Sequence, residues 1–413
     1  MTLESHDSMK KWVKEHAGDD CSDLLLKYKG KKLEFSLEFA VCQITCRRKT
    51  MSKLTSFLKH EDFLFPDYLS AEQASDERVA KYHTYLIGND KKILDMTSGL
   101  GIDAMTASMA GNYVIACDID RDKTEALIHN ASVLNIPSEP SNHLEYPVKT
   151  SLQAVCENSE RFLFNSSEKY DVIFIDPARR GENNARLYSF KDCVPDVLSL
   201  MPMMLMRSKM ILIKASPLLD ITQILREIPC TTNLHLICVR NECKEVLVEI
   251  IKDIEFQGIH VLDLNDKGIE SHIYFDANDI HLSGCPYATE SDLTEGNYLY
   301  EPNAALMKLK SPGAICSRFD GLKKLSSNTS LYVSGKLHKN FPGRISRITD
   351  IPARKQLKKL RNKPYNVVCR NYPSEVKDLR RKLGVKEGAK DFIYAFRAYD
   401  IAVPTIVCTH KIN

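Results

Sequence analysis

The sequence of 413 residues lacks the segments that carry a chain into or across a membrane. Its first twenty residues mix lysines with acidic residues and contain only short apolar stretches, which is not the pattern of a signal peptide. No run of about 18 apolar residues follows later in the chain. We therefore expect neither export nor membrane insertion, and the expected location is the cytoplasm.

Metal-ligand and disulfide spacings are also missing. The 13 cysteines include no CxxC pair and no arrangement typical of zinc. Cys42 and Cys46 can share a helix face, but use as small apolar side chains explains them better. We expect reduced thiols and no metal site.

The net charge of +3 is small but unevenly distributed. Residues 331–390 hold 17 lysines and arginines against four acidic residues, a balance of +13, so the rest of the chain sums to −10. A segment this basic in an otherwise acidic chain favours a polyanionic partner such as RNA. Within it Lys355, Lys358, Lys359 and Lys363 recur at a spacing close to that of a helical turn, and a helix there would present a basic stripe.

The length and the 43% of apolar residues predict more than one domain. The first part of the chain has the apolar spacing of helices. In the next part, short apolar runs alternate with helical stretches, as in a parallel sheet with crossover helices. An antiparallel hairpin is expected after them. Strands are expected at 92–95, 113–118, 152–156, 170–176 and 210–214, and the hairpin at 234–251. We divide the chain into a helical domain (1–88), the sheet domain (89–254), an acidic, loop-rich connecting region that could be ferredoxin-like (255–330) and a basic domain (331–413).

A glycine-containing turn follows the first predicted strand. Asp95 ends the strand, and Thr97, Gly99 and Gly101 come before a helix. Glycines let the backbone approach a ligand closely, and the start of a helix offers free N–H groups. Asp118 ends the next strand, where its carboxylate can accept both hydroxyls of a ribose. These residues predict a nucleoside-containing cofactor.

The glycine pattern alone fits NAD as well as S-adenosylmethionine (SAM). Asp95 favours SAM, because its carboxylate can reach the ammonium of a methionine moiety and would repel a pyrophosphate. The five parallel strands and terminal hairpin also resemble the seven-stranded, Rossmann-like sheet of class I methyltransferases. Asn158, just after the third predicted strand, is the candidate for contact with the adenine amine.

A second motif, Asp176-Pro177-Ala178-Arg179, follows the fourth predicted strand. It places a carboxylate and a fixed carbonyl on the substrate side of the cofactor. It resembles the first half of the Asp/Asn-Pro-Pro-aromatic element of methyltransferases that act on amino groups of bases. Because Ala178 and Arg179 replace the second proline and the aromatic ring, the adenine-N6 type is disfavoured. Arg179 can stack on a base, hold a phosphate or form a surface ion pair. We take Asp176, Pro177 and Arg179 as the candidate catalytic residues.

The same motif resembles that of RNA 5-methyluridine methyltransferases, in which a cysteine after the next strand attacks the ring. Here Lys214-Ala215-Ser216-Pro217 follows that strand without a thiol, which disfavours covalent carbon methylation. Lys214 and Ser216 can line the substrate pocket, or serve as a snorkelling lysine and a turn serine. Cys193 is expected on a helix, in a packing role.

Several runs along the chain together resemble a bacterial group of class I SAM-dependent methyltransferases with a C-terminal THUMP-like domain, related to RNA guanine-N2 methyltransferases. These runs are Leu69–Ser75, Asp176–Arg180, Asp192–Pro195, Ile213–Asp220, Asn241–Glu245, Tyr298–Asn303 and Asn340–Arg344. The resemblance implies an α/β fold with a Rossmann-like seven-stranded core, an N-terminal helical domain and an α+β THUMP-like module, with SAM as cofactor. Ala215 and Asp76 depart from the group's pattern.

The leading hypothesis is direct in-line transfer of a methyl group from SAM to a base nitrogen of tRNA or rRNA, with guanine favoured and RNA bound through residues 331–390. Asp176 would accept a hydrogen bond from the acceptor amine. Two alternatives stay open. A nicotinamide-dependent oxidoreductase on the same sheet would need a Tyr-Lys, His or Cys constellation, and none stands at a recognisable spacing. A non-catalytic RNA-binding protein with a vestigial cofactor domain is weakened by the presence of both Asp95 and Asp118.

Overall fold

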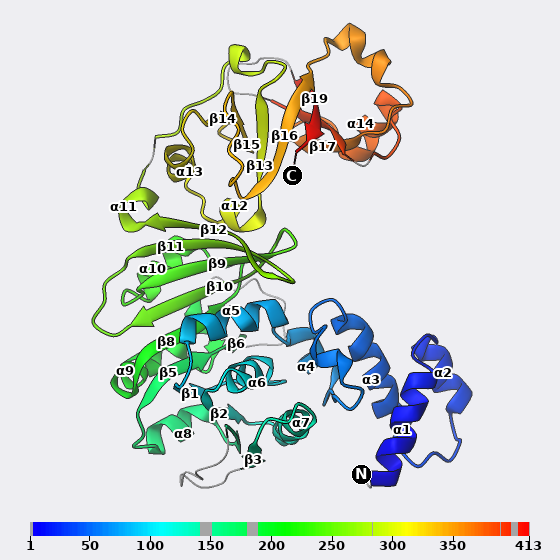
Figure 1. Ribbon diagram of the computed structural model, residues 1–413, viewed down its shortest axis with the longest axis vertical. Helices are drawn as coiled ribbons and strands as arrows, with labels where there is room; N and C mark the ends of the chain where they lie inside the picture. The colour runs from blue at the N-terminus through cyan, green and yellow to red at the C-terminus, as the bar shows by residue number, and fades with distance from the viewer. Residues whose placement is uncertain are drawn as a thin grey trace. The chain divides into compact units, whose positions relative to one another are not determined.

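The computed structural model describes residues 3–140, 151–179, 189–282, 284–388, 390–397 and 404–412 (Figure 1). The chain divides into two compact units. Unit 1 comprises Met1–Thr231 and Val248–Ile254, and unit 2 comprises Thr232–Leu247 and Glu255–Asn413. Among the described residues, no helix has both the length and the apolar character that crossing a membrane requires.

Helices make up the first part of unit 1, as the apolar spacing predicts. They are α1 (Leu3–Glu15), α2 (Cys21–Tyr28), α3 (Leu37–Thr50), the 3₁₀ helix η1 (Phe57–Lys59), α4 (Tyr68–Gln73) and α5 (Glu77–Ile87). Side chains that accept backbone N–H groups cap the starts of α2 to α5: Asp20, Ser36, Asp67 and Asp76. Met9, Trp12 and Leu24 pack with residues of α3 in a small apolar core.

A parallel sheet forms the rest of unit 1, in the order β8-β5-β1-β2-β4-β3. Its strands are β1 (Lys92–Asp95), β2 (Tyr113–Asp118), β3 (Ser138–Pro140), β4 (Leu152–Cys156), β5 (Tyr170–Ile175) and β8 (Ser208–Ala215). The helices between and after them are α6 (Ile102–Met109), α7 (Arg121–Val133), α8 (Ser159–Asn165), α9 (Val197–Arg207) and α10 (Ile221–Glu227). The predicted strands are therefore confirmed. The register sets Asp95 beside Ala116 of β2 and Phe174 of β5, so that the carboxyl ends of these strands share one edge.

Unit 2 begins with most of the predicted hairpin. Strands β9 (Asn233–Val239) and β10 (Glu242–Ile251) are hydrogen-bonded neighbours, and the last residues of β10 belong to unit 1. Arg240 and Asn241 connect them with φ angles of 52° and 63°, the positive values of a two-residue hairpin turn. The antiparallel hairpin is thus confirmed.

Two further strands contradict the expectation of a loop-rich region after residue 255. β11 (Gly258–Asn265) runs parallel to β9, and β12 (Gly268–Asp276) runs antiparallel to β11. Polar residues such as His260, Asp263 and Glu270 interrupt the apolar pattern of these strands. The sequence pattern therefore did not predict either strand.

The C-terminal part of unit 2 is a seven-stranded sheet in the order β14-β15-β13-β16-β19-β18-β17. The strands are β13 (Tyr298–Pro302), β14 (Lys323–Ser326), β15 (Thr329–Ser334), β16 (Gly343–Asp350), β17 (Asn366–Arg370), β18 (Asp391–Phe396) and β19 (Thr405–Lys411). The helices are α11 (Ala277–Ile280), α12 (Ala304–Lys308), α13 (Pro312–Arg318) and α14 (Val376–Leu383), with two 3₁₀ helices, η3 (Glu290–Asp292) and η4 (Arg354–Leu360).

The basic segment is only partly the helix that the lysine spacing predicts. Lys355, Lys358 and Lys359 lie on η4, whereas Lys363 lies beyond its end. Pro364 follows directly and removes a backbone donor, so a longer helix cannot continue there. The basic surface is therefore a short 3₁₀ helix and the turn after it, not a continuous helical stripe.

Candidate functional site

A cavity of about 310 Å³ lies at the carboxyl ends of β1, β2, β4 and β5 in unit 1. The strand order changes direction between β1 and β5, and open α/β sheets bind their ligands at such a switch point. Seven residues predicted from the sequence line the cavity: Asp95, Thr97, Gly99, Gly101, Asp118, Asn158 and Asp176. The volume is that of a small-molecule site.

The glycine turn after β1 adopts the backbone conformation that its sequence predicts. Gly99 and Gly101 have φ angles of 54° and 80°, a region that other residues rarely enter. At Gly101 a Cβ atom would lie 2.2 Å from the Leu127 side chain of α7, so a larger residue would displace Leu127 in addition to straining the backbone. At Gly99 the space that a Cβ would enter is open, which leaves room for a ligand against the backbone.

Asp118 at the end of β2 is held in place by two backbone groups. The Gly99 N–H donates to its Oδ2 at 3.0 Å, and the Asp120 N–H donates to its Oδ1 at 2.9 Å. A carboxylate has about four lone-pair sites, so each oxygen can accept one more hydrogen bond. The side chain is half-buried at the cavity wall. It is therefore fixed in a position to accept two vicinal hydroxyls.

Asp95 is the most buried carboxylate of the cavity, with 3% of its surface exposed. It accepts the Thr97 N–H at 3.0 Å. Burial raises the pKa of Asp95 to about 8, and the nearby Asp103 and Asp176 add to this effect. Thr97 in turn accepts the Asp176 N–H through Oγ1 at 2.6 Å, which ties the turn after β1 to the end of β5.

A network of charged groups surrounds Asp176. Lys214 of β8 donates through Nζ to Asp176 Oδ2 at 2.5 Å and to Ser75 Oγ at 2.9 Å. Ser75 donates to Asp103 Oδ2, and Asp103 Oδ1 lies 2.7 Å from His83 Nδ1. Burial opposes the charge on Asp103, but Lys214 and His83 together hold its pKa well below the usual range. Lys214 thus faces the site and is not a snorkelling surface lysine.

Helix α4 and the residues that follow it supply a wall of the cavity that periodicity and motifs do not predict. Ser70, Gln73, Ala74 and Ser75 line it. The only signal in the sequence is the run Leu69–Ser75, which belongs to the family resemblance. No periodic pattern identifies these residues as part of a site.

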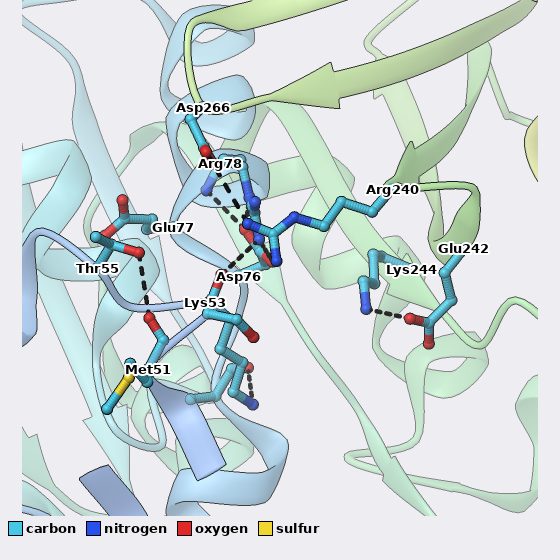
Figure 2. Close-up of polar contacts among 12 residues, drawn as sticks. Met51, Lys53, Thr55, Asp76, Glu77, Arg78, Arg240, Glu242, Lys244 and Asp266 are labelled. Atoms are coloured by element: carbon cyan, nitrogen blue, oxygen red, sulfur yellow. Dashed lines mark hydrogen bonds and ion pairs between the residues drawn. The ribbon is translucent and has the colours of Figure 1, made fainter. Parts of the chain in front are cut away.

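Polar contacts fix this segment to the turn after α3 (Figure 2). Lys53 Nζ donates to the carbonyls of Glu72 and Ala74 at 2.8 and 3.0 Å. Asp76, which departs from the family pattern, caps α5 and forms a buried ion pair with Arg78 at 2.6 Å. Arg78 also donates to the Ser52 carbonyl at 2.9 Å. These bonds hold Ser75 in its place beside Lys214.

The remaining predicted residues are placed less directly. Asn158 lines the cavity, and its Oδ1 accepts the Arg161 N–H at 3.0 Å as the cap of α8. Pro177 follows Asp176 directly in the connection between β5 and β6 (Ala178–Arg179). The side chain of Arg179, and the whole of Arg180, lie outside the described residues.

The strand that pairs with β6 corrects the expectation of a helix at Cys193. The helix expected at Cys193 is wrong, because this residue lies on β7 (Cys193–Val194), which pairs antiparallel with β6. Its side chain is buried, in keeping with the packing role. Val194 and Pro195 line the cavity near Asp176.

Comparisons with known proteins agree with this architecture. Residues 298–342 match a ferredoxin-like domain family, and residues 343–410 match the family described as THUMP domain-like. The fold is similar to the crystal structure of a provisionally named methyltransferase from Porphyromonas gingivalis W83, with a TM-score of 0.79, 24% identity and 100% coverage of both chains. No curated protein matches the sequence.

Two other structures are similar over part of the chain. One, provisionally named an RNA methyltransferase, is from Pyrococcus horikoshii. It is 13% identical in sequence, the match covers 50% of this chain and 99% of that chain, and the TM-score is 0.32. The other, a provisionally named methyltransferase of Streptococcus mutans complexed with SAH, has 14% identity, 43% and 49% coverage and a TM-score of 0.31.

The fold is therefore the α/β fold of class I methyltransferases, as the sequence resemblance implied. Its C-terminal residues 343–410 form a THUMP-like domain.

Proposed function

We propose that this chain is a SAM-dependent methyltransferase that transfers a methyl group to a base nitrogen of tRNA or rRNA, with guanine favoured. The observation that carries the proposal is one cavity shared by three carboxylates from three strand ends, Asp95, Asp118 and Asp176. Two of them suit the two ends of SAM, and the third suits the group that receives the methyl.

The chemistry of the cavity supports SAM over a dinucleotide. Asp118 can accept both hydroxyls of a ribose, and the open space at Gly99 leaves the backbone accessible to the ligand. Among the described residues no cationic side chain forms an ion pair with Asp95, so the ammonium of a methionine moiety would supply its counter-charge. A pyrophosphate beside Asp95 would oppose ionisation of its carboxyl group, whereas an ammonium favours it.

SAM, when bound, supplies an electrophilic methyl group. Asp176 would accept a hydrogen bond from the acceptor amine, and a carboxylate can do so while Lys214 stays bound to Oδ2. The hydrogen bond from Lys214 fixes the orientation of the Asp176 carboxylate. Pro177 and Arg179 complete the proposed catalytic set, Pro177 by restricting the backbone and Arg179 by stacking on the base or holding a phosphate. Most of the acceleration would come from proximity and orientation.

The basic segment supports RNA as the partner. Residues 331–390 carry a charge of +13, and Lys355, Lys358 and Lys359 project from a short 3₁₀ helix within it. Dense cations favour phosphate contacts. Guanine is favoured because the sequence resembles a group related to RNA guanine-N2 methyltransferases.

Calorimetry with SAM and NAD side by side tests the proposed cofactor. SAM should bind the purified protein, and NAD should not bind measurably. Binding of NAD alone would favour the oxidoreductase alternative. Binding of neither ligand, in a protein that binds RNA, would favour the non-catalytic alternative.

A further inference from the structure

Two cysteines that are 31 residues apart in sequence meet in unit 2. Cys285 precedes the seven-stranded sheet, and Cys316 lies on α13. Their Sγ atoms are 3.0 Å apart, which is a thiol–thiol contact. Bond formation needs the two sulfur atoms to approach each other by roughly 1 Å, to about 2.05 Å.

The backbone on both sides of this pair is fixed. After Cys285, Pro286 and Ala288 exchange hydrogen bonds with Lys324 of β14, at 2.8 and 2.9 Å. At Gly313 of α13, a Cβ would lie 2.1 Å from the Leu282 carbonyl, so the chain before Cys285 packs directly on this helix. The two sulfur atoms are therefore held near each other by the fold.

The two thiols have different surroundings. Cys285 is partly exposed, whereas Cys316 is buried, with 8% of its surface exposed. The hydrogen bond from Cys316, helped by Lys324, lowers the pKa of Cys285 to about 7. The same contact raises the pKa of Cys316 well above its usual range. A thiolate that is both accessible and adjacent to a second thiol is the arrangement of redox-responsive cysteines.

We infer that Cys285 and Cys316 are a modification site that forms a reversible disulfide in the presence of a peroxide. The Cys285 thiolate attacks a peroxide oxygen, the O–O bond breaks, and a sulfenic acid forms as hydroxide leaves and takes up a proton. The Cys316 sulfur then attacks the sulfenic sulfur, and its proton leaves with the hydroxyl as water. In total, two thiols and one hydrogen peroxide give one disulfide and two waters. This site is independent of the proposed methyl transfer.

The disulfide would close a loop that contains β13. Glu301 of β13 accepts hydrogen bonds from Arg344 at 2.9 Å and Arg370 at 2.6 Å. The closed loop therefore includes the carboxylate that pairs with two arginines of the THUMP-like domain. A covalent loop of this length raises the thermal stability of the folded state.

The chain offers an internal comparison. Cys42 and Cys46 also lie close, with Sγ atoms 3.6 Å apart, but both are on α3. They are 5% and 0% exposed, within the helical part of unit 1. An oxidant in solution cannot reach them in the folded protein, so they should stay reduced under the same treatment.

The test is mass spectrometry of the purified full chain after brief exposure to hydrogen peroxide, with free thiols blocked by N-ethylmaleimide. Compared with the untreated protein, the intact protein should lose the two N-ethylmaleimide adducts of Cys285 and Cys316, recover them after dithiothreitol, and yield a peptide that links Cys285 to Cys316. Cys285→Ser and Cys316→Ala should abolish the loss, while the control Cys369→Ser, a half-buried cysteine of β17, should keep it. The oxidised protein should also melt at a higher temperature.

A second measurement does not depend on oxidation. The rate of Cys285 alkylation by iodoacetamide should be half-maximal near pH 7 in the unmodified protein, and at a clearly higher pH in Cys316→Ala. Oxidation of Cys285 to sulfinic acid without the cross-link would overturn the inference. So would an alkylation profile that Cys316→Ala leaves unchanged.

Discussion

Replacement of Asp118 by alanine tests the ribose assignment most sharply. Each hydrogen bond to a charged group contributes about 1.5 to 3 kcal/mol. Asp118 is half-buried, so water can partly replace its carboxylate, and the lower value applies to each of the two hydroxyls. The loss of about 3 kcal/mol corresponds to a rise of about a hundredfold in the Kd for SAM.

The same substitution also removes the acceptor of two backbone donors. The Gly99 and Asp120 N–H groups, at 3.0 and 2.9 Å, would have to bond to water. Asp118→Asn separates the loss of the ribose contacts from the loss of the backbone acceptor. The amide oxygen of the asparagine can keep one hydrogen bond to the backbone, while the negative charge is removed. The Kd of this variant should rise by about tenfold, in line with one charged hydrogen bond.

Isothermal titration calorimetry with SAM measures these changes. Asp122→Ala is the matched control, because Asp122 is an exposed aspartate in the first turn of α7 and does not line the cavity. It should bind SAM as the unmodified protein does. An unchanged Kd in a folded Asp118→Ala protein would refute the assignment of Asp118 to the ribose.

Three other substitutions test the acceptor, the methionine end of SAM and the RNA surface. Asp176→Ala should leave the Kd for SAM nearly unchanged and abolish most methyl transfer, as measured with labelled SAM, because this carboxylate is assigned to the acceptor. In the SAM-free protein Asp95 holds a proton up to about pH 8. The affinity for SAM should therefore increase as the pH rises from about 6 to 8, by up to about tenfold per pH unit. The Asp95→Asn protein should bind SAM weakly at every pH. Charge reversal at Lys355, Lys358 and Lys359 should weaken RNA binding across sequences and reduce the log-log salt slope by about 0.7 to 0.9 for each phosphate that is no longer bound.

The acceptor and RNA-surface variants each have a matched control and a contrary result. For Asp176 the control is Asp171→Ala, at the opposite end of β5, and a large rise in the Kd for SAM in Asp176→Ala would mean that the role is misassigned. For the lysines the control is reversal at the exposed Lys29, Lys31 and Lys32 of unit 1. Equal RNA affinity in the two triple variants would count against the η4 surface.

The raised pKa of Asp95 also predicts how the free energy of unfolding depends on pH. Burial raises its pKa in the folded protein from 3.8 to about 8, so between these values the folded chain holds a proton that the unfolded chain has released. The free energy of unfolding should therefore decrease as the pH rises through this window. Asp95→Asn should show a smaller decrease in thermal melts at a series of pH values. Identical pH dependence in both proteins would mean that Asp95 is ionised in the folded state.

The strands of unit 1 could be predicted from the sequence because they are buried on both faces. β1, β2 and β4 begin and end where the apolar runs do. The residues at their carboxyl ends could be predicted for the same reason, since parallel strands bring their ends to one edge. Strands β11 and β12 could not be predicted, because polar residues interrupt their pattern.

The support around Asp176 could not be predicted in this way. Lys214 and Ser75 are 139 residues apart in sequence, and Asp103 and His83 are 20 apart on different helices. A polar residue on a helix or in a connection carries no periodic signal of the partner it will meet. Only the folded arrangement shows that Lys214 lies between Asp176 and Ser75.

Methyl transfer to RNA itself is the most direct test of the proposed function. Total RNA from cells that lack the gene, in which the target is unmodified, is incubated with the protein and labelled SAM, and the nucleosides are analysed by mass spectrometry. We expect label in a base-methylated nucleoside, with guanosine favoured, and none with Asp176→Ala. A protein that binds SAM but transfers no label to any RNA nucleoside would contradict the proposal.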